Sequence, residues 1–277
     1  MQRLVLSIPA LFVFVSLPST SYPQAKRDIP LPQDKSAAVV TLDFRGGFGP
    51  PRQDSRPPLT IFADARVRVV DTAGTVSPLE TKMSAEELQD LLRFAIDDHK
   101  FFDFDEAMAT REVLAESKKA EFSFAVSDGI ETVIRIRTAE QEHEARFYVL
   151  SDHARAYPDA KLVRDLQAVE ERLSHLLNIV RAGGRDRIAE VLKAANDYLK
   201  TAYPAVPAVI EDDFLYMEQP ASDRQRFVFL PGRLKPRPTQ TLEQRIQNMI
   251  SPAPEFSVEV DYSSGAPPMV QVKHPPQ

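Results

Sequence analysis

Short runs along the chain alternate apolar and polar residues, which is the pattern of half-buried strands. The first such run is Val39–Phe44, and a glycine pair followed by a Pro-rich stretch breaks it. Leu59–Phe62 and Val67–Val70 flank a short polar turn, so we expect a hairpin there. Ala65 stands in that turn, where glycine usually supplies a positive φ, which predicts either a longer turn or local strain.

Three further alternating runs follow in the middle of the chain, and we expect them to form an antiparallel meander with one buried face. They are Phe122–Val126, Val133–Arg137 and Ala145–Leu150. The last third of the chain carries less pattern. Its expected elements are strands at Phe227–Leu230, Phe256–Val260 and Met269–Val272, and a short helix at Leu242–Ile250.

The clearest helix begins at Ser84. Ser84 and Glu87 form an S-x-x-E capping box, in which each side chain satisfies a backbone N–H of the other. Apolar residues then recur at helical spacing until the helix ends near Lys100. The phenylalanines that follow, Phe101 and Phe104 among them, are expected in the core. A looser helix is expected over residues 105–119.

A long helix is expected from Pro158, since proline is tolerated in a first helical turn. Its apolar residues repeat at spacings of four and three up to the glycine pair at 183–184, which stops it. The width of this stripe favours packing on a sheet over a two-helix seam. Ser174 and His175 are expected on its polar side. A second helix runs from about Asp186 to Pro204.

Together these elements predict an α+β fold. An antiparallel sheet of five or six strands is packed on one face by two helices, with an appended helix and C-terminal strands. The expected division is a signal peptide over residues 1–21, a flexible leader over 22–36, an α+β domain over 37–182, and an appended helix and β-rich region over 183–277.

The first 21 residues have the layout of an export signal. Arg3 is the only charge, an apolar stretch runs from Leu4 to Leu17, and small residues follow it. This stretch is shorter than the roughly 20 apolar residues that a spanning helix needs. We therefore expect cleavage before Tyr22 and a mature protein in the periplasm or outside the cell, with no membrane span.

Composition narrows the possible functions. The chain contains no cysteine, which excludes thiolate catalysis, cysteine-ligated zinc, iron–sulfur clusters and lipoprotein anchoring. Its formal net charge is −6, and loss of Arg3 with the signal would make it −7. An acidic chain without a basic patch is a poor nucleic-acid binder. We expect no cofactor.

The densest group of possible metal ligands lies around the end of the first helix. Oxygen-rich groups of this kind suit calcium or magnesium. The spacing fails the EF-hand pattern, so the preferred interpretation is a solvated helix end, and no metal or catalytic residue is assigned. The candidates that remain to be checked are Asp98, His99, Asp103 and Asp105.

Other chemical motifs are absent or unspecific. His143 and His153 are ten residues apart and are able to meet across neighbouring strands, but no H-E-x-x-H helix supports a zinc site. His99, His175 and His274 have no partner pattern. No G-x-S-x-G elbow exists, and the glycines at 46–49 are not followed by the Lys-Ser or Lys-Thr of a phosphate loop.

Several of these motifs occur together in a known order, and residues 40–180 resemble a bacterial exported domain of unknown function. The matching pieces are Gly46–Pro50, Thr60–Asp64, Ser84–Leu92, Phe101-Phe102 and Asp128-Gly129. This chain lacks the paired cysteines near the glycine break, and Ala65 replaces the expected glycine. The resemblance implies a fold and an exported location, and no activity.

Three functions stay open at this stage. The leading hypothesis is a non-catalytic exported module that binds an unidentified protein or envelope component. The second is a hydrolase that uses a metal or carboxylates near residues 97–106. The third is an assembly protein that dimerises through the helix at 158–182.

Overall fold

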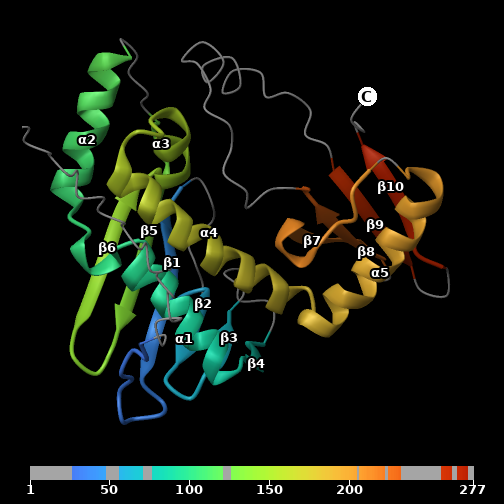
Figure 1. Cartoon of the computed structure of the whole chain (residues 1–277), viewed down its shortest axis with the longest axis horizontal. Helices are drawn as coiled ribbons and strands as arrows, with labels where there is room; N and C mark the ends of the chain where they lie inside the picture. The colour runs from blue at the N-terminus through green and yellow to red at the C-terminus, as the bar shows by residue number, and fades with distance from the viewer. Residues whose placement is uncertain are drawn as a thin grey trace, which may run out of the picture.

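The computed structural model describes residues 27–47, 56–70, 77–120, 126–204, 206–221, 224–231, 257–263 and 267–273. The expected signal peptide, the strand residues Phe122–Ala125, the helix at 242–250 and His274 lie outside these ranges. The described part is an α+β fold with a six-strand sheet, a four-strand sheet and five α-helices, as the sequence predicts (Figure 1).

The larger sheet is antiparallel throughout and has the strand order β4-β3-β2-β1-β5-β6. Its strands are β1 (Ala38–Gly46), β2 (Leu59–Phe62), β3 (Arg66–Val69), β4 (Leu79–Lys82), β5 (Ile130–Arg137) and β6 (Glu142–Tyr148). The expected strand at 39–44 and the hairpin at 59–70 are confirmed.

One face of this sheet is the floor of the main core. Directly opposed residues in five neighbouring strands are all apolar and buried, as alternation requires of a half-buried sheet. They are Val69, Leu59, Leu42, Ile134 and Ala145.

Four helices contribute buried side chains to this core. They are α1 (Ala85–Arg93), α2 (Glu106–Lys119), α3 (Leu150–Ala156) and α4 (Lys161–Arg181). The capping box of α1 is present, because Ser84 Oγ accepts from Glu87 N at 3.1 Å and Ser84 N donates to Glu87 Oε2 at 2.6 Å. A π-turn at Phe94–Asp98 and a 3₁₀ turn at Phe101–Asp103 follow, and Phe101 and Phe104 are buried as expected.

The long helix begins three residues later than the sequence indicates. Pro158 belongs to a turn in which Ala160 N donates to Tyr157 O at 3.0 Å, and α4 begins at Lys161. A proline suits such a turn as well as a first helical turn, which explains the error. The expected strand at 145–150 is also too long, because β6 ends at Tyr148 and α3 takes up the following residues.

The β2–β3 turn contains the strain that Ala65 predicts. Ala65 has φ +64°, and Ala65 N donates to Phe62 O at 2.9 Å. Ile61 pairs with Val67, which is the geometry of a longer turn with a left-handed last residue. Asp64 Oδ1 accepts from Arg66 N at 3.1 Å and stabilises the turn.

The second sheet has the order β10-β9-β8-β7 and packs one face on α5 (Arg185–Ala202). Its strands are β7 (Phe214–Ala221), β8 (Arg224–Phe229), β9 (Ser257–Ser263) and β10 (Met269–Lys273). Val258 and Val260 on β9 and Phe227 and Phe229 on β8 form a core of their own with α5. The sequence predicts three of these strands and misses β7.

Helix α4 connects the two cores. Leu177 and Val180 join the first core, whereas Ile179 and Ala182 join the second. Asn178 Nδ2 donates to Leu215 O at 2.8 Å. The expectation that His175 is on the polar side of α4 is wrong, because its ring is buried and Nδ1 lies 3.2 Å from Phe214 O. The strand missed in the sequence covers that side of the helix.

Candidate functional site

The residues named as possible metal ligands do not converge. Asp98 and Asp103 are exposed, and Asp105 caps α2 by accepting from Met108 N at 2.7 Å. His99 Nδ1 lies 3.3 Å from Asp165 Oδ1 on α4. Within the described ranges, no three His, Asp or Glu side chains are arranged to hold one metal ion.

His143 and His153, which were expected to meet across neighbouring strands, pack instead against different aromatic rings. The His143 ring lies edge-on to Phe101, with centroids 5.6 Å apart. The His153 ring stacks on Tyr157 at 6.0 Å and meets Phe147 edge-on. Burial lowers the pKa of His153, against the opposing effect of the Asp152 charge.

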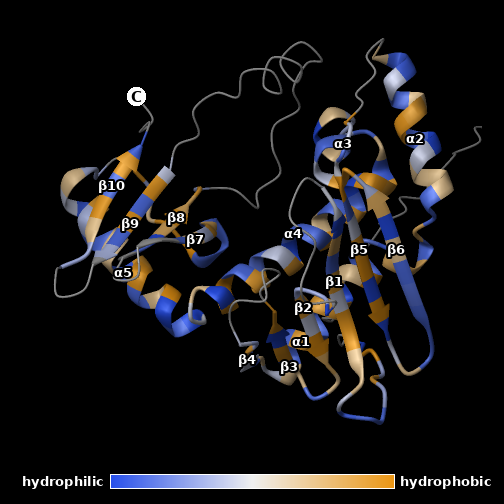
Figure 2. Cartoon of the chain, turned by 180° about the vertical axis from the view of Figure 1, so that it is seen from behind, coloured by the Kyte–Doolittle hydropathy of each residue, from blue (hydrophilic) through white to orange (hydrophobic). Residues whose placement is uncertain are grey.

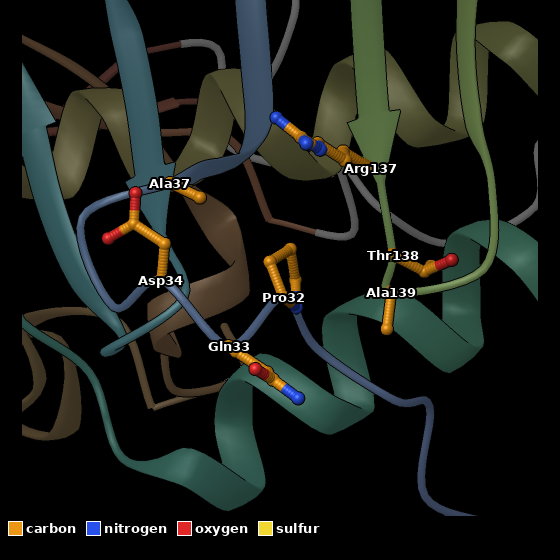
Figure 3. A pocket seen from close by; sticks show the side chains of 7 residues that line it. All are labelled: Pro32, Gln33, Asp34, Ala37, Arg137, Thr138 and Ala139. Carbon is orange, nitrogen blue, oxygen red and sulfur yellow. The ribbon is translucent and has the colours of Figure 1, made fainter.

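A surface hollow of about 390 Å³ lies where residues 32–37 meet the end of β5 (Figure 3). Hydrogen bonds from Ser36 and the nearby charge of Arg137 lower the pKa of Asp34. The Thr138 hydroxyl is used in the β5–β6 turn. Asp34 and Thr138, two polar residues that line the hollow, therefore serve to stabilise local turns. The lining is Pro32, Gln33, Asp34, Ala37, Arg137, Thr138 and Ala139.

A different arrangement lies on the face of the large sheet opposite the main core. Figure 2 shows the large sheet with the whole chain turned by 180° from the view of Figure 1. The buried side chains of α1 to α4 cluster with the apolar residues of the opposite face. One line of directly opposed residues crosses all six strands on the face away from the main core, and we call it the polar row. Its members, from β4 to β6, are Glu80, Arg68, Thr60, Thr41, Arg135 and Glu144.

At the β5–β6 end of the polar row, charge is balanced. Arg135 Nη2 donates to Glu144 Oε2 at 2.5 Å, and Arg146 Nε donates to Glu144 Oε1 at 2.6 Å. Burial raises the pKa of Glu144, but the bonds from the two arginines outweigh it and hold the pKa below its usual value. This end of the row is a closed ion-pair network.

At the β2–β3 end, one atom of the threonine and one of the arginine lack hydrogen-bond partners. Thr60 is 2% exposed, and its Oγ1 has no hydrogen-bond partner. The Nε of Arg68 is also buried without a partner. Glu80 opposes Arg68 in register, but its carboxylate lies 3.8 Å from Arg66 Nη1 instead.

The phenylalanine beside this pair holds both arginines in place. The guanidinium of Arg66 lies 4.5 Å from the centroid of the Phe62 ring, and that of Arg68 lies 5.0 Å from it. Cation–π contacts of this kind restrict long side chains without neutralising them. The two guanidiniums are therefore oriented while still charged.

The four-strand sheet also has a charged face, on the side away from α5. Arg226 Nε lies 3.0 Å from Asp261 Oδ1 and 3.8 Å from Glu259 Oε2. Lys273 Nζ lies 2.6 Å from Glu259 Oε1. Burial and the neighbouring Glu218 raise the pKa of Tyr216. These acids are paired with cations of their own sheet.

The polar row is not recognisable from the sequence alone. Its members come from six strands, and their register is set by pairing across the sheet. One signal was available: Arg66 and Arg68, and likewise Arg135 and Arg137, alternate with buried apolar residues. In the described residues, no helix is long and apolar enough to cross a bilayer. Comparison of the chain with protein-family models, curated proteins and solved structures gave no match.

Proposed function

We propose that this chain is a non-catalytic exported module that binds an acidic protein partner on the polar-row face of its six-strand sheet. The polar row is the observation that carries the proposal. The opposite face of the sheet and four helices build the main core, whereas the polar-row face carries the charged side chains of the sheet, with buried apolar residues such as Phe62 and Val133 between them. Binding is the use that this arrangement supports best.

Charge supports the choice of an acidic partner. Positions in register with the polar row carry six arginines and Lys82, against five carboxylates, which leaves +2 on a chain of net −6. A patch opposite in sign to its own protein orients an acidic partner and speeds association. The arginines are Arg45, Arg66, Arg68, Arg135, Arg137 and Arg146.

A pair of photo-crosslinking variants tests the face. Benzoylphenylalanine replaces Arg137 on the polar-row face, or Arg172 on α4, in cells that export the protein. The two arginines are matched, because their side chains are 52% and 47% exposed and each is 3.6–3.8 Å from one carboxylate. We expect a discrete protein adduct at position 137 only, and its loss when Arg135→Glu is added.

Two outcomes would contradict this proposal. Equal adducts at positions 137 and 172 would show contact without a preferred face. An adduct at 137 that contains glycan and no protein would make the partner an envelope polysaccharide.

The exported location is tested separately. The basic start, short apolar stretch and small residues before Tyr22 support export. N-terminal sequencing of protein from the periplasmic or secreted fraction should begin at Tyr22. An intact Met1 in the cytosolic fraction would remove the exported part of the proposal.

A further inference from the structure

We propose that Thr60 and Arg68 form a binding site for a carboxylate, supplied by an Asp or Glu side chain of the acidic partner. This inference rests on the proposed function and adds the chemistry of recognition. It starts from two buried polar atoms, Thr60 Oγ1 and Arg68 Nε, neither of which has a hydrogen-bond partner. The two residues are directly opposed on β2 and β3.

Buried polar atoms without partners are rare in folded proteins, since each loses its bonds to water and gains nothing. A hydroxyl and a guanidinium N–H that lie side by side both donate hydrogen bonds, so one oxygen-bearing acceptor would satisfy both. The β2–β3 end of the polar row therefore lacks a hydrogen-bond acceptor and not a donor.

The other end of the polar row shows which acceptor fits. The two ends of the row mirror each other. Arg68 is opposed by Thr60 and Arg135 by Thr41, and the two threonines oppose each other at the centre. Glu144 supplies a carboxylate to Arg135 through two bonds, from Nε at 3.1 Å and Nη2 at 2.5 Å. Glu80 opposes Arg68 as Glu144 opposes Arg135, but its carboxylate lies 3.8 Å from Arg66 Nη1 instead, so Arg68 Nε is left without a carboxylate partner among the described residues.

The surroundings of Arg68 suit capture of an anion. Phe62 orients the guanidiniums of Arg66 and Arg68 at 4.5 and 5.0 Å from its ring centroid. Among the described residues, the carboxylates near Arg66 lie at long distances, 3.6 Å for Asp64 and 3.8 Å for Glu80. Two oriented cations beside an unsatisfied hydroxyl lower the entropic cost of binding.

Calorimetric titration with a hexaglutamate peptide tests the site in the whole mature chain. We expect Arg68→Gln to weaken binding about tenfold, which is the loss of one charge-assisted hydrogen-bond pair. The matched control is Arg172→Gln on α4, an exposed arginine that is already 3.8 Å from Asp212, which should change affinity less than about threefold.

A second variant separates binding from folding. Thr60→Val keeps the shape of the side chain and removes the unsatisfied hydroxyl, so the Tm should stay the same or rise while peptide affinity falls. A hydroxyl with a structural role would lower the Tm instead. A fall in Tm with unchanged peptide affinity would overturn the assignment.

The outcomes distinguish this site from the proposed function. If Arg68→Gln weakens peptide binding no more than Arg172→Gln does, or if inorganic phosphate binds the protein and hexaglutamate does not, the carboxylate site is wrong, while the crosslink at position 137 still supports the binding module. If Arg68→Gln and Thr60→Val lose the peptide but no partner crosslinks at position 137, the site stands and the proposed function fails.

Discussion

Single residues in the left-handed region mark the places where this fold is tightly constrained. Val149 has φ +54° although it is β-branched and buried. Its N–H donates to Ile130 O at 2.8 Å, and its carbonyl accepts from His153 N, so hydrogen bonds on both sides fix the conformation. Such a residue costs on the order of 1 kcal/mol and persists only where its surroundings demand it.

The residue facing Val149 should tolerate no side chain. A Cβ on Gly129 would lie 2.2 Å from Val149 Cγ2, which forces displacement of a stiff side chain. We expect Gly129→Ala to lower the free energy of unfolding by about 1–3 kcal/mol in urea titrations. Asp128→Gly is the control, because Asp128 has φ +61° and glycine relieves that strain. Equal losses in both variants would refute the steric explanation.

His153 should make stability depend on pH. Burial lowers its pKa below the usual value of about 6.5, so the unfolded state binds the proton first. The stabilising contribution is complete above the unfolded pKa and is lost as pH falls through the folded pKa. Urea midpoints should therefore decline from pH 7.5 toward 5.5, and His153→Gln should flatten that decline. A decline of the same slope in the variant would assign the effect to other groups.

At the scale of elements, helices and strands whose signals lie within one segment were predicted correctly, whereas those defined by other parts of the chain were missed. The helix from Ser84 was predicted correctly because its capping box and apolar spacing lie within one segment. Helix α3 was missed because the alternating pattern of 145–150 continues past Val149. The strand ends there through the positive φ of Val149, which the pattern does not reveal. Strand β7 has little alternation of its own, and pairing with β8 defines it.

The α1 cap provides a direct test of a local signal. Ser84→Ala removes the acceptor for Glu87 N and leaves that N–H without its intrahelical substitute. We expect a loss of about 1 kcal/mol in the free energy of unfolding. Ser151→Ala on α3 is the control, since Ser151 is exposed and alanine favours helix, and it should be neutral. A neutral Ser84→Ala would mean that water replaces the cap.

Leu173 tests the role of α4. It is fully buried, and the stripe that would form a two-helix seam packs within its own chain. Leu173→Ala should cost about 2–5 kcal/mol of unfolding free energy through the cavity it leaves. Sedimentation should show an unchanged mass for the folded variant. A change in mass with unaltered stability would favour assembly through α4.

At the scale of the whole molecule, α4 joins two cores that the sequence divided at residue 182. Asn178 reaches β7, and Ile179 and Ala182 pack under the second sheet. Asn178→Ala should cost about 1–2 kcal/mol because Leu215 O loses its partner. Amide exchange in β7 should then quicken more than in β1. Gln167→Ala, which removes bonds only within α4, should leave β7 exchange unchanged.

The fold class was predictable from the sequence, and the candidate site was not. Alternation in each strand fixes which residues share a side, but it does not fix which strands are neighbours. Thr41 and Arg135 become opposed only when β1 pairs with β5, almost a hundred residues later in the chain. The missing partners of Thr60 and Arg68 appear only after side chains are placed.

Because α4 contributes side chains to both cores, its length should be constrained in evolution. Each helical residue turns by about 100°, so deleting one residue before Leu177 would rotate Ile179 out of one core and a neighbour into it. Natural variants should therefore substitute residues in this segment while keeping its length. Insertions and deletions should accumulate instead in the turns beyond either end of the rod.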